Sequence, residues 1–445
     1  MSGDVGLTES PRSEGAGLAG AGAGTLSADW LLPVVGPPIE NGLVRFDGGR
    51  IVEVREGRAD LHYADAVILP GFVNAHSHLE YSLYAGFADG EAFGPWITAH
   101  VTRKNLLDFD EMLALARAGA LELLASGVTS CADYSFSGAA GVAAADAGLR
   151  AIVYLEVFGA DVAAAERQFT EKRARLDGSP LVTVGISPHA PYSCSLDVYR
   201  YCLGLRIPVG THLAESPNET EWLLHGSGPL RTIESFLPPP SGLRPVATLE
   251  PVLGPDLLCA HCVELEEHEI ALLAERGVPV AHCPRSNALL GCGIAPLAGL
   301  RAAGVTVGLG TDSPASTPSF DMFDELRTAV YTARARERDA GALSASDALR
   351  LATVDAARAL RIDHEVGTLT PGKRADVTVV SLAGSPYHPV EDPAAAVVFG
   401  GSPDRVLETI VEGQTRYTRT DRENQWREVR NIASAARRRM LAPPR

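Results

Sequence analysis

Eight short apolar, β-rich runs recur along the chain with helix-like segments between them, and this alternation limits the fold more than any other feature. The runs are 71–78, 128–135, 151–158, 181–190, 208–216, 257–263, 279–287 and 306–314. Segments such as 110–127 and 266–277 have helical periodicity, and the second ends in glycine, a common helix stop. Alternating βα units of this number predict an α/β fold, a (β/α)8 TIM-like barrel.

The segments that flank the alternating units have a different pattern. Both flanks contain short alternating strands and turn pairs such as Asp47-Gly48, which indicates antiparallel β structure. The expected domains are a disordered tail (1–27), a small β-sandwich domain built from both chain ends (28–70 with 364–420), the barrel (71–363) and a basic C-terminal helix (421–445).

The overall composition disfavours several classes of partner. With 39 basic and 55 acidic residues, the formal net charge is −16, which is unfavourable for binding nucleic acid. No run approaches the ~18 apolar residues that a membrane span needs. Residues 1–24 lack the pattern of a signal peptide, and the seven cysteines are scattered. We therefore expect a cytoplasmic protein with reduced thiols.

Histidines and carboxylates gather at the ends of the predicted strands. In a barrel of this kind the chemistry lies at the carboxyl ends of the strands. Any one of these histidines has an ordinary explanation as a hydrogen-bonded core residue, but that explanation would have to be repeated for six histidines at five strand ends. The strand-end residues are His76, His78, His189, His212, Glu215, His261, His282 and Asp312.

Part of this set has the composition of a metal site. His76 and His78 are two residues apart, so on a strand both point to the same face. Together with His212 and Asp312 they would hold one divalent ion, Zn²⁺ or alternatively Fe²⁺. A water on such an ion would ionise near pH ~7. Glu215 could then move protons, and His261 could hold the water or the leaving group.

At this point the motifs resemble a known family. The stretches "PGFVNAHSH", "HLAES", "AHC", "HCPRSN", "GLGTDSP" and "GTLTPGKRADVTVV" resemble the amidohydrolase superfamily, in particular its branch of ring deaminases and s-triazine hydrolases. The resemblance covers about residues 28–420. It implies a mononuclear site with the four ligands named above, Glu215 as proton shuttle, His261 at the water and His189 in reach of the substrate.

One departure from the binuclear members sharpens this expectation. Those members carry a carboxylated lysine at the end of the fourth strand, whereas this chain has "SPHAPYS" there. Its only lysines are Lys104, Lys172 and Lys373. A binuclear site is therefore disfavoured.

The substrate is the less constrained part of the prediction. A carboxylate such as Glu215 favours deamination of a ring carbon, although displacement of chloride from a triazine stays open. The insertion "HLEYSLYAGFADGEAFGPWITAHVTRKN" resembles aminofutalosine deaminases of menaquinone biosynthesis, which implies 6-amino-6-deoxyfutalosine, a purine nucleoside-like molecule. The alternatives are adenosylhomocysteine, methylthioadenosine, guanine or a triazine, and a non-catalytic metal-binding barrel is disfavoured because the ligand set is intact.

Several residues are candidates for substrate contact. The implied carboxyphenyl group would bind a cation near the mouth, for which Arg103, Lys104 and Arg285 are candidates. Trp96 is a candidate for stacking on a ring, although packing beneath a loop explains it equally well. Glu80 could orient a ligand histidine or pair with a neighbouring cation. A homodimer stays open.

Overall fold

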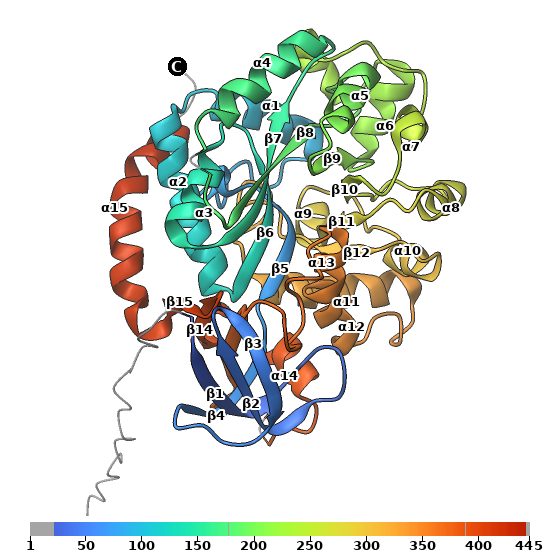
Figure 1. Cartoon of the computed structure of the whole chain (residues 1–445). Coiled ribbons are helices and arrows are strands. Elements are labelled where there is room, and N and C mark those ends of the chain that lie inside the picture. The colour runs from blue at the N-terminus through green and yellow to red at the C-terminus, as the bar shows by residue number, and fades with distance from the viewer. Residues whose placement is uncertain (1–21, 177, 388, 442–445) are drawn as a thin grey trace, which may run out of the picture.

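The computed structural model describes residues 22–176, 178–387 and 389–441, and an eight-stranded parallel barrel forms its centre (Figure 1). The strands pair in chain order, and each lies within or one residue beyond one of the predicted runs. They are β5 (Phe72–Ser77), β6 (Val128–Ser135), β7 (Arg150–Val157), β8 (Val182–Pro188), β9 (Val209–Leu213), β10 (Leu257–His261), β11 (Val280–His282) and β12 (Val307–Leu309). A bridge between Ser77 and Asp312 brings the last strand to the first. The TIM-like fold is confirmed.

Helices surround the barrel and return the chain between strands. Strong local signals set their ends. Asp108 caps α2 and forms a capping box with Glu111, and Gly148 ends α3 in a left-handed conformation. The helices are α2 (Phe109–Ala125), α3 (Ala139–Ala147), α4 (Val162–Arg173), α5 (Leu196–Gly204), α8 (Glu267–Glu275), α9 (Pro284–Leu289), α10 (Leu297–Ala302), α11 (Met322–Glu337), α12 (Ala345–Leu351) and α13 (Val354–Ala359).

Two insertions follow β5 and β9 and contact each other. The first contains η1 (Leu79–Tyr81) and α1 (Phe93–Lys104). The second contains α6 (Pro217–His225), η2 (Pro229–Phe236), α7 (Pro245–Leu249) and η3 (Glu250–Val252). The backbone N–H of Gly94 donates to Asn218 at 3.1 Å, and the hydroxyls of Thr98 and Thr232 are 2.9 Å apart. These contacts fix α1 against the second insertion.

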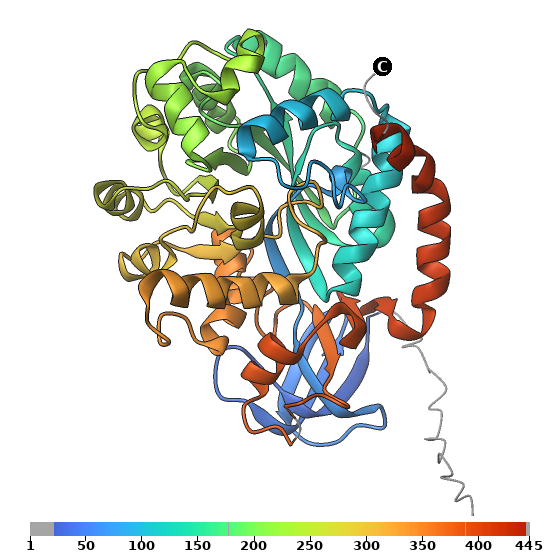
Figure 2. The same cartoon turned by 180° about the vertical axis from the view of Figure 1, so that it is seen from behind.

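The small domain is one seven-stranded sheet that joins both ends of the chain, as Figure 2 also shows. Its strands are β1 (Gly24–Leu31), β2 (Ile39–Asp47), β3 (Arg50–Glu56), β4 (His62–Pro70), β13 (Val377–Ser381), β14 (Val406–Val411) and β15 (Gln414–Thr418). The expected antiparallel pairing holds except between β1 and β4, which are parallel. Residues 24–27, which the sequence assigns to the tail, belong to β1; residues 1–21 lie outside the described part of the chain.

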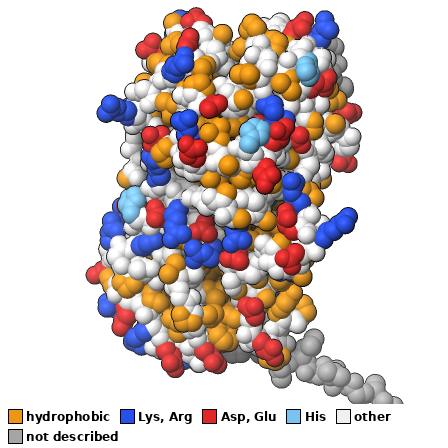
Figure 3. Space-filling view, turned by 90° about the vertical axis from the view of Figure 1, so that its right-hand side faces the viewer, with side chains coloured by type: hydrophobic (Ala, Val, Ile, Leu, Met, Phe, Trp, Pro, Cys, Tyr) orange, Lys and Arg blue, Asp and Glu red, His pale blue; other side chains and the backbone are white. Residues whose placement is uncertain are grey.

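The remaining helices include the expected basic one. They are α14 (Pro393–Gly400), η4 (Pro403–Arg405), η5 (Arg419–Asp421) and α15 (Arg422–Leu441). Helix α15 lies along α2 in both views and buries Ala433, Ala436 and Met440 (Figures 1 and 2). On the face drawn in Figure 3, acidic and basic side chains are interspersed. None of the helices within the described residues is long and apolar enough to cross a membrane.

A buried group of charges connects the barrel to the small domain. Arg150, at the start of β7, contacts Asp376 at 3.3 Å and Glu412 at 3.1 Å. Arg150 and Asp376 are both buried, at 8% and 4% exposure. The Asp376 carboxylate also accepts the backbone N–H of Glu412 at 2.9 Å. Removing the guanidinium would therefore leave a buried carboxylate without its cation.

We expect Arg150→Met to lower the free energy of unfolding by about 3–5 kcal/mol, because breaking one side of a buried pair leaves the other uncompensated. The matched control is Arg117→Met, which removes an exposed pair with Asp146 and should cost less than about 1 kcal/mol. Urea unfolding followed by circular dichroism measures both. Equal shifts for the two variants would contradict the assigned role of Arg150.

Candidate active site

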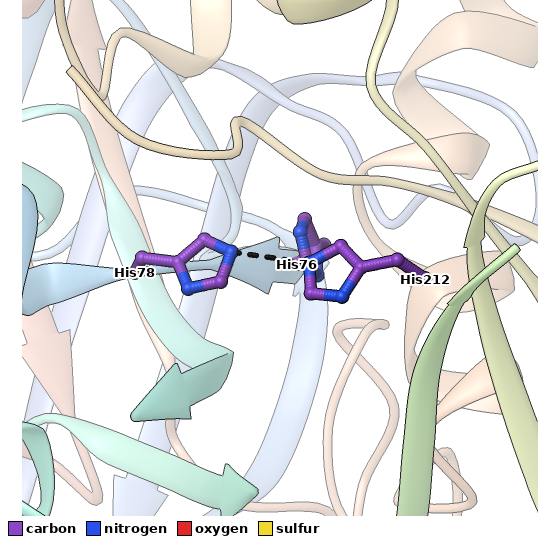
Figure 4. A group of neighbouring side chains, drawn as sticks. All are labelled: His76, His78 and His212. Carbon is purple, nitrogen blue, oxygen red and sulfur yellow. Dashed lines mark hydrogen bonds between the residues drawn. The ribbon is translucent and has the colours of Figure 1, made fainter. Parts of the chain in front are cut away.

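Three histidines converge where the barrel strands end. His76 lies in β5, His78 directly follows that strand, and His212 lies in β9; Figure 4 shows their rings turned toward one another. One ring nitrogen from each lies within 4.8 Å of the others, and the Nε2 atoms of His78 and His212 are only 3.3 Å apart. All three side chains are buried.

The hydrogen bonds around these rings leave their lone pairs facing inward. His78 Nδ1 donates to the carbonyl of Tyr134 at 2.7 Å, and His212 Nδ1 donates to the carbonyl of His189 at 2.8 Å. A neutral imidazole has one N–H, so both Nε2 atoms face each other as acceptors with no proton between them. Neither ring nitrogen of His76 has a partner within the described residues. A cation at the centre would satisfy all three rings.

Burial also favours the protonation state that a metal ligand needs. Burial, together with the neighbouring histidines, lowers the pKa of His76 and of His212 well below its usual value. Both rings are therefore neutral near pH 7, as a metal ligand must be.

Asp312 supplies an oxygen to the same centre. Its Oδ1 is 3.7 Å from His76 Nε2 and 3.5 Å from His78 Nε2. Its Oδ2 accepts hydrogen bonds from Ser286 at 2.6 Å and Ser316 at 2.8 Å. Burial alone would raise the pKa of Asp312, but nearby histidines and the two serine hydroxyls hold it below its usual value. Three imidazoles and one ionised carboxylate fit a single Zn²⁺ or Fe²⁺.

A carboxylate and an imidazole lie beside this centre. Glu215 Oε1 is 3.7 Å from His261 Nε2, and one ligand atom from each lies within 4.8 Å of Asp312. His261 Nδ1 contacts the Asn287 side-chain oxygen at 3.0 Å, which leaves Nε2 as an unpaired acceptor. Burial, with the charges of Asp312 and Glu219, raises the pKa of Glu215 well above its usual value. The pair can thus accept and donate protons next to the metal ligands.

A cavity opens in front of these groups. Three of the residues expected to contact a substrate line it: Trp96, Lys104 and His189. The Trp96 indole stacks on His100, with ring centres 5.2 Å apart, and its N–H donates to the carbonyl of Ala315 at 2.8 Å. The full lining is His78, Tyr81, Phe93, Trp96, Ile97, His100, Lys104, Glu156, His189, Tyr192, His212, Glu215, His261, Asp312 and Ser313.

Neither of the two arginines expected at the mouth lines this cavity. Arg103 donates to the carbonyl of Met440 in α15. Arg285 is buried against Glu325, with its Nε 2.5 Å from the carboxylate. The structure therefore corrects the expectation for both. Consecutive helical residues are rotated by ~100°, so Arg103 faces α15 while Lys104 faces the cavity.

Some lining residues lie outside the set that the sequence singled out. Glu156 is the one charged residue in "AIVYLEVF", and a lone charge late in an apolar barrel strand was the available signal.

Glu80 lies in the first insertion but contacts no ligand histidine. Its carboxylate instead accepts from Ser135, Ser137 and the backbone of Ala139, and so anchors η1 to the start of α3.

Three histidines and one carboxylate at barrel strand ends, with Glu215 and His261 beside a cavity, have the composition expected of a metal-dependent hydrolase. The chain belongs to the amidohydrolase family, whose profile matches residues 67–416, and it is a hydrolase acting on C–N bonds. The 5-methylthioadenosine/S-adenosylhomocysteine deaminase of Syntrophobacter fumaroxidans is 34% identical, over 80% of this chain and 81% of the relative. The 5'-deoxyadenosine deaminase of Methanothermobacter thermautotrophicus is 32% identical, over 84% and 89%.

One solved structure is similar to this chain over most of its length. An adenosine deaminase from Xanthomonas campestris, crystallised with bound zinc, has a TM-score of 0.80 and 26% identity. The match covers 93% of this chain and 98% of that one. The resemblance inferred from the motifs is therefore confirmed at the level of the family.

We expect His212→Ala to weaken metal binding by more than about 100-fold, since even loss of a residue supporting a ligand costs about 10–100-fold. Calorimetric titration of Zn²⁺ into metal-depleted protein measures this without any assay of activity. His225→Ala, at the end of α6 and outside the cluster, is the control. Unchanged affinity in His212→Ala would contradict the ligand assignment.

Proposed function

We propose that this protein is a zinc-dependent aminohydrolase that deaminates the adenine ring of a 5'-modified nucleoside. The carrying observation is the inward-facing set of three histidines and Asp312, with Glu215 and His261 at its edge and a cavity in front. The names of the relatives add the substrate class, because both curated relatives and the solved neighbour are deaminases of adenine nucleosides.

Each part of the reaction can be assigned to particular residues of the site. A divalent metal held by His76, His78, His212 and Asp312 would activate a water for attack on the ring carbon. His261 Nε2, as an unpaired acceptor, orients that water. Glu215 takes one proton from the water and delivers it to the ring nitrogen. It then takes the second proton, from the hydroxyl now bonded to the ring carbon, and delivers it to the exocyclic amine. The C–N bond breaks and ammonia leaves, so one water is consumed for each amine released.

A second cavity supports an apolar substituent on the nucleoside. It adjoins the first, with which it shares Ile97, Lys104, His189 and Tyr192. Its other walls are mostly apolar: Val101, Asn105, Phe136, Phe158, Gly159, Ser193, Ile233, Phe236 and Leu237. A methylthio group would be accommodated there at low desolvation cost.

The relatives favour substrates of the methylthioadenosine and adenosylhomocysteine type over 6-amino-6-deoxyfutalosine, the substrate implied by the first insertion. One observation keeps 6-amino-6-deoxyfutalosine as a second candidate substrate. Phe136 and Phe158 line the apolar cavity, and aromatic walls of this kind suit an aromatic substituent.

We expect Glu215→Gln to lower kcat by about 10²–10⁴-fold, because the amide cannot carry protons between water and ring. Zinc content, measured by mass spectrometry, should stay at the wild-type level because Glu215 is not among the ligands. Retention of wild-type ammonia release in this variant would contradict its role. Glu221→Gln, on the neighbouring helix α6, is the matched control.

A substrate panel separates the candidate substrates. We expect ammonia release from methylthioadenosine, adenosylhomocysteine or 5'-deoxyadenosine to exceed release from guanine by at least about 100-fold in kcat/KM, since a misplaced polar group in a closed site is costly. 6-Amino-6-deoxyfutalosine is measured alongside. A higher kcat/KM for it than for the other nucleosides would reverse the order proposed here.

A further inference from the structure

Two buried side chains of opposite charge, Lys104 and Glu156, line the first cavity without a hydrogen bond to either head group from the described residues. Lys104, at the end of α1, is buried at 6% exposure and lines both cavities. Glu156, near the end of β7, is buried at 1% exposure and lines the first. Nothing in the metal chemistry described above uses either residue.

Lys104 has no counter-ion in contact. Its Nζ lies 4.2 Å from the centre of the Phe136 ring and 5.1 Å from that of Phe158. Throughout the described part of the chain, no carboxylate comes within 4.0 Å of it and no hydrogen bond reaches it. Two aromatic faces stabilise an ammonium only partly, so its three donors remain available to a ligand.

Glu156 is equally unpaired. Its Oε2 is buried with no hydrogen-bond partner among the described residues. Its Oε1 is 4.0 Å from His189 Nε2, which is beyond hydrogen-bonding distance, and a carboxylate oxygen of Glu156 also lies within 4.8 Å of a ring nitrogen of His212. Lys172 donates to the backbone carbonyl of Glu156, at 2.5 Å, and not to its carboxylate. A buried carboxylate with open oxygens is costly unless a ligand donates to it.

The chemistry of the two groups defines what can lie between them. An ammonium only donates and a carboxylate only accepts, and the two are too far apart to pair directly. A hydroxyl both accepts and donates, so it can bridge them and satisfy each. A single anion would bind Lys104 but be repelled by Glu156, and the pair together carries no net charge.

We propose that Lys104 and Glu156 bind the sugar hydroxyls of the substrate and make the enzyme specific for a ribonucleoside. This inference rests on the proposed function and deepens it. The ring lies at the metal ligands, the hydroxylated sugar lies at the Lys104–Glu156 pair, and the 5' substituent enters the apolar cavity beyond Lys104.

The test compares a 5'-modified adenine ribonucleoside with its 2'-deoxy and 3'-deoxy analogues. We expect the wild-type enzyme to prefer the ribonucleoside by about 10–100-fold in kcat/KM, the range for hydrogen bonds to charged groups. In Glu156→Gln and in Lys104→Met this preference should fall toward one. Most of the change should be in KM, with zinc content unchanged. Glu166→Gln, exposed on α4, and Lys373→Met, in the small domain, are the matched controls.

Each outcome decides the proposal. Equal losses on ribo- and deoxynucleosides in Glu156→Gln would show a structural role and overturn it, as would a wild-type enzyme without preference. If the wild type releases no ammonia from any adenine nucleoside, the proposed function fails. The same ribo/deoxy comparison made as Kd by calorimetry then still decides whether the pair binds sugar hydroxyls, and failure of every nucleoside to bind overturns both.

Discussion

The backbone N–H of Asp312 donates to the carbonyl of His76 at 3.0 Å. This one hydrogen bond both closes the barrel and positions the group formed by the three histidines and Asp312. It joins the first strand to the segment after the last, and the side chain of Asp312 then points at the ring of His76. The close approach needs Gly310, where a Cβ would lie 2.6 Å from that of His76. A shift of β12 would therefore both open the barrel and displace Asp312.

The same contact explains why strain gathers at the strand ends. Ala214, His261 and Asp312 have φ values of 51°, 72° and 55°, a left-handed conformation that side chains other than glycine and asparagine rarely adopt. Each such residue costs about 1–3 kcal/mol unless its surroundings compensate. Here the backbone turns sharply out of the strand, which directs the side chains of His261 and Asp312 across the barrel mouth instead of along it.

The sequence predicts the barrel, and it places His76 and His78 on one face, because both depend on short periods. Eight apolar runs give the eight strands, and the spacing of His76 and His78 puts both on one face. It is harder to predict from the sequence which side chains of a helix face the cavity, because that depends on how the helix is rotated about its axis. Arg103 and Lys104 are equivalent in the sequence, and only the packing of α1 against α15 and η2 decides which one enters the cavity. The sequence shows Glu156 as a lone charge late in an apolar strand, but only the structure shows that its Oε2 is buried without a hydrogen-bond partner among the described residues.

The two ends of the cavity are held by different parts of the molecule. Barrel closure fixes the ligands at the metal end, so that end varies little without loss of the fold. Lys104 at the substrate end depends on α1, which contacts the second insertion through Gly94 and Thr98 and the C-terminal helix through Arg103. Substitutions in those contacts can move Lys104 relative to Glu156 while the metal ligands stay in place. Substrate preference can therefore diverge among relatives of about one-third identity that share the chemistry of the barrel.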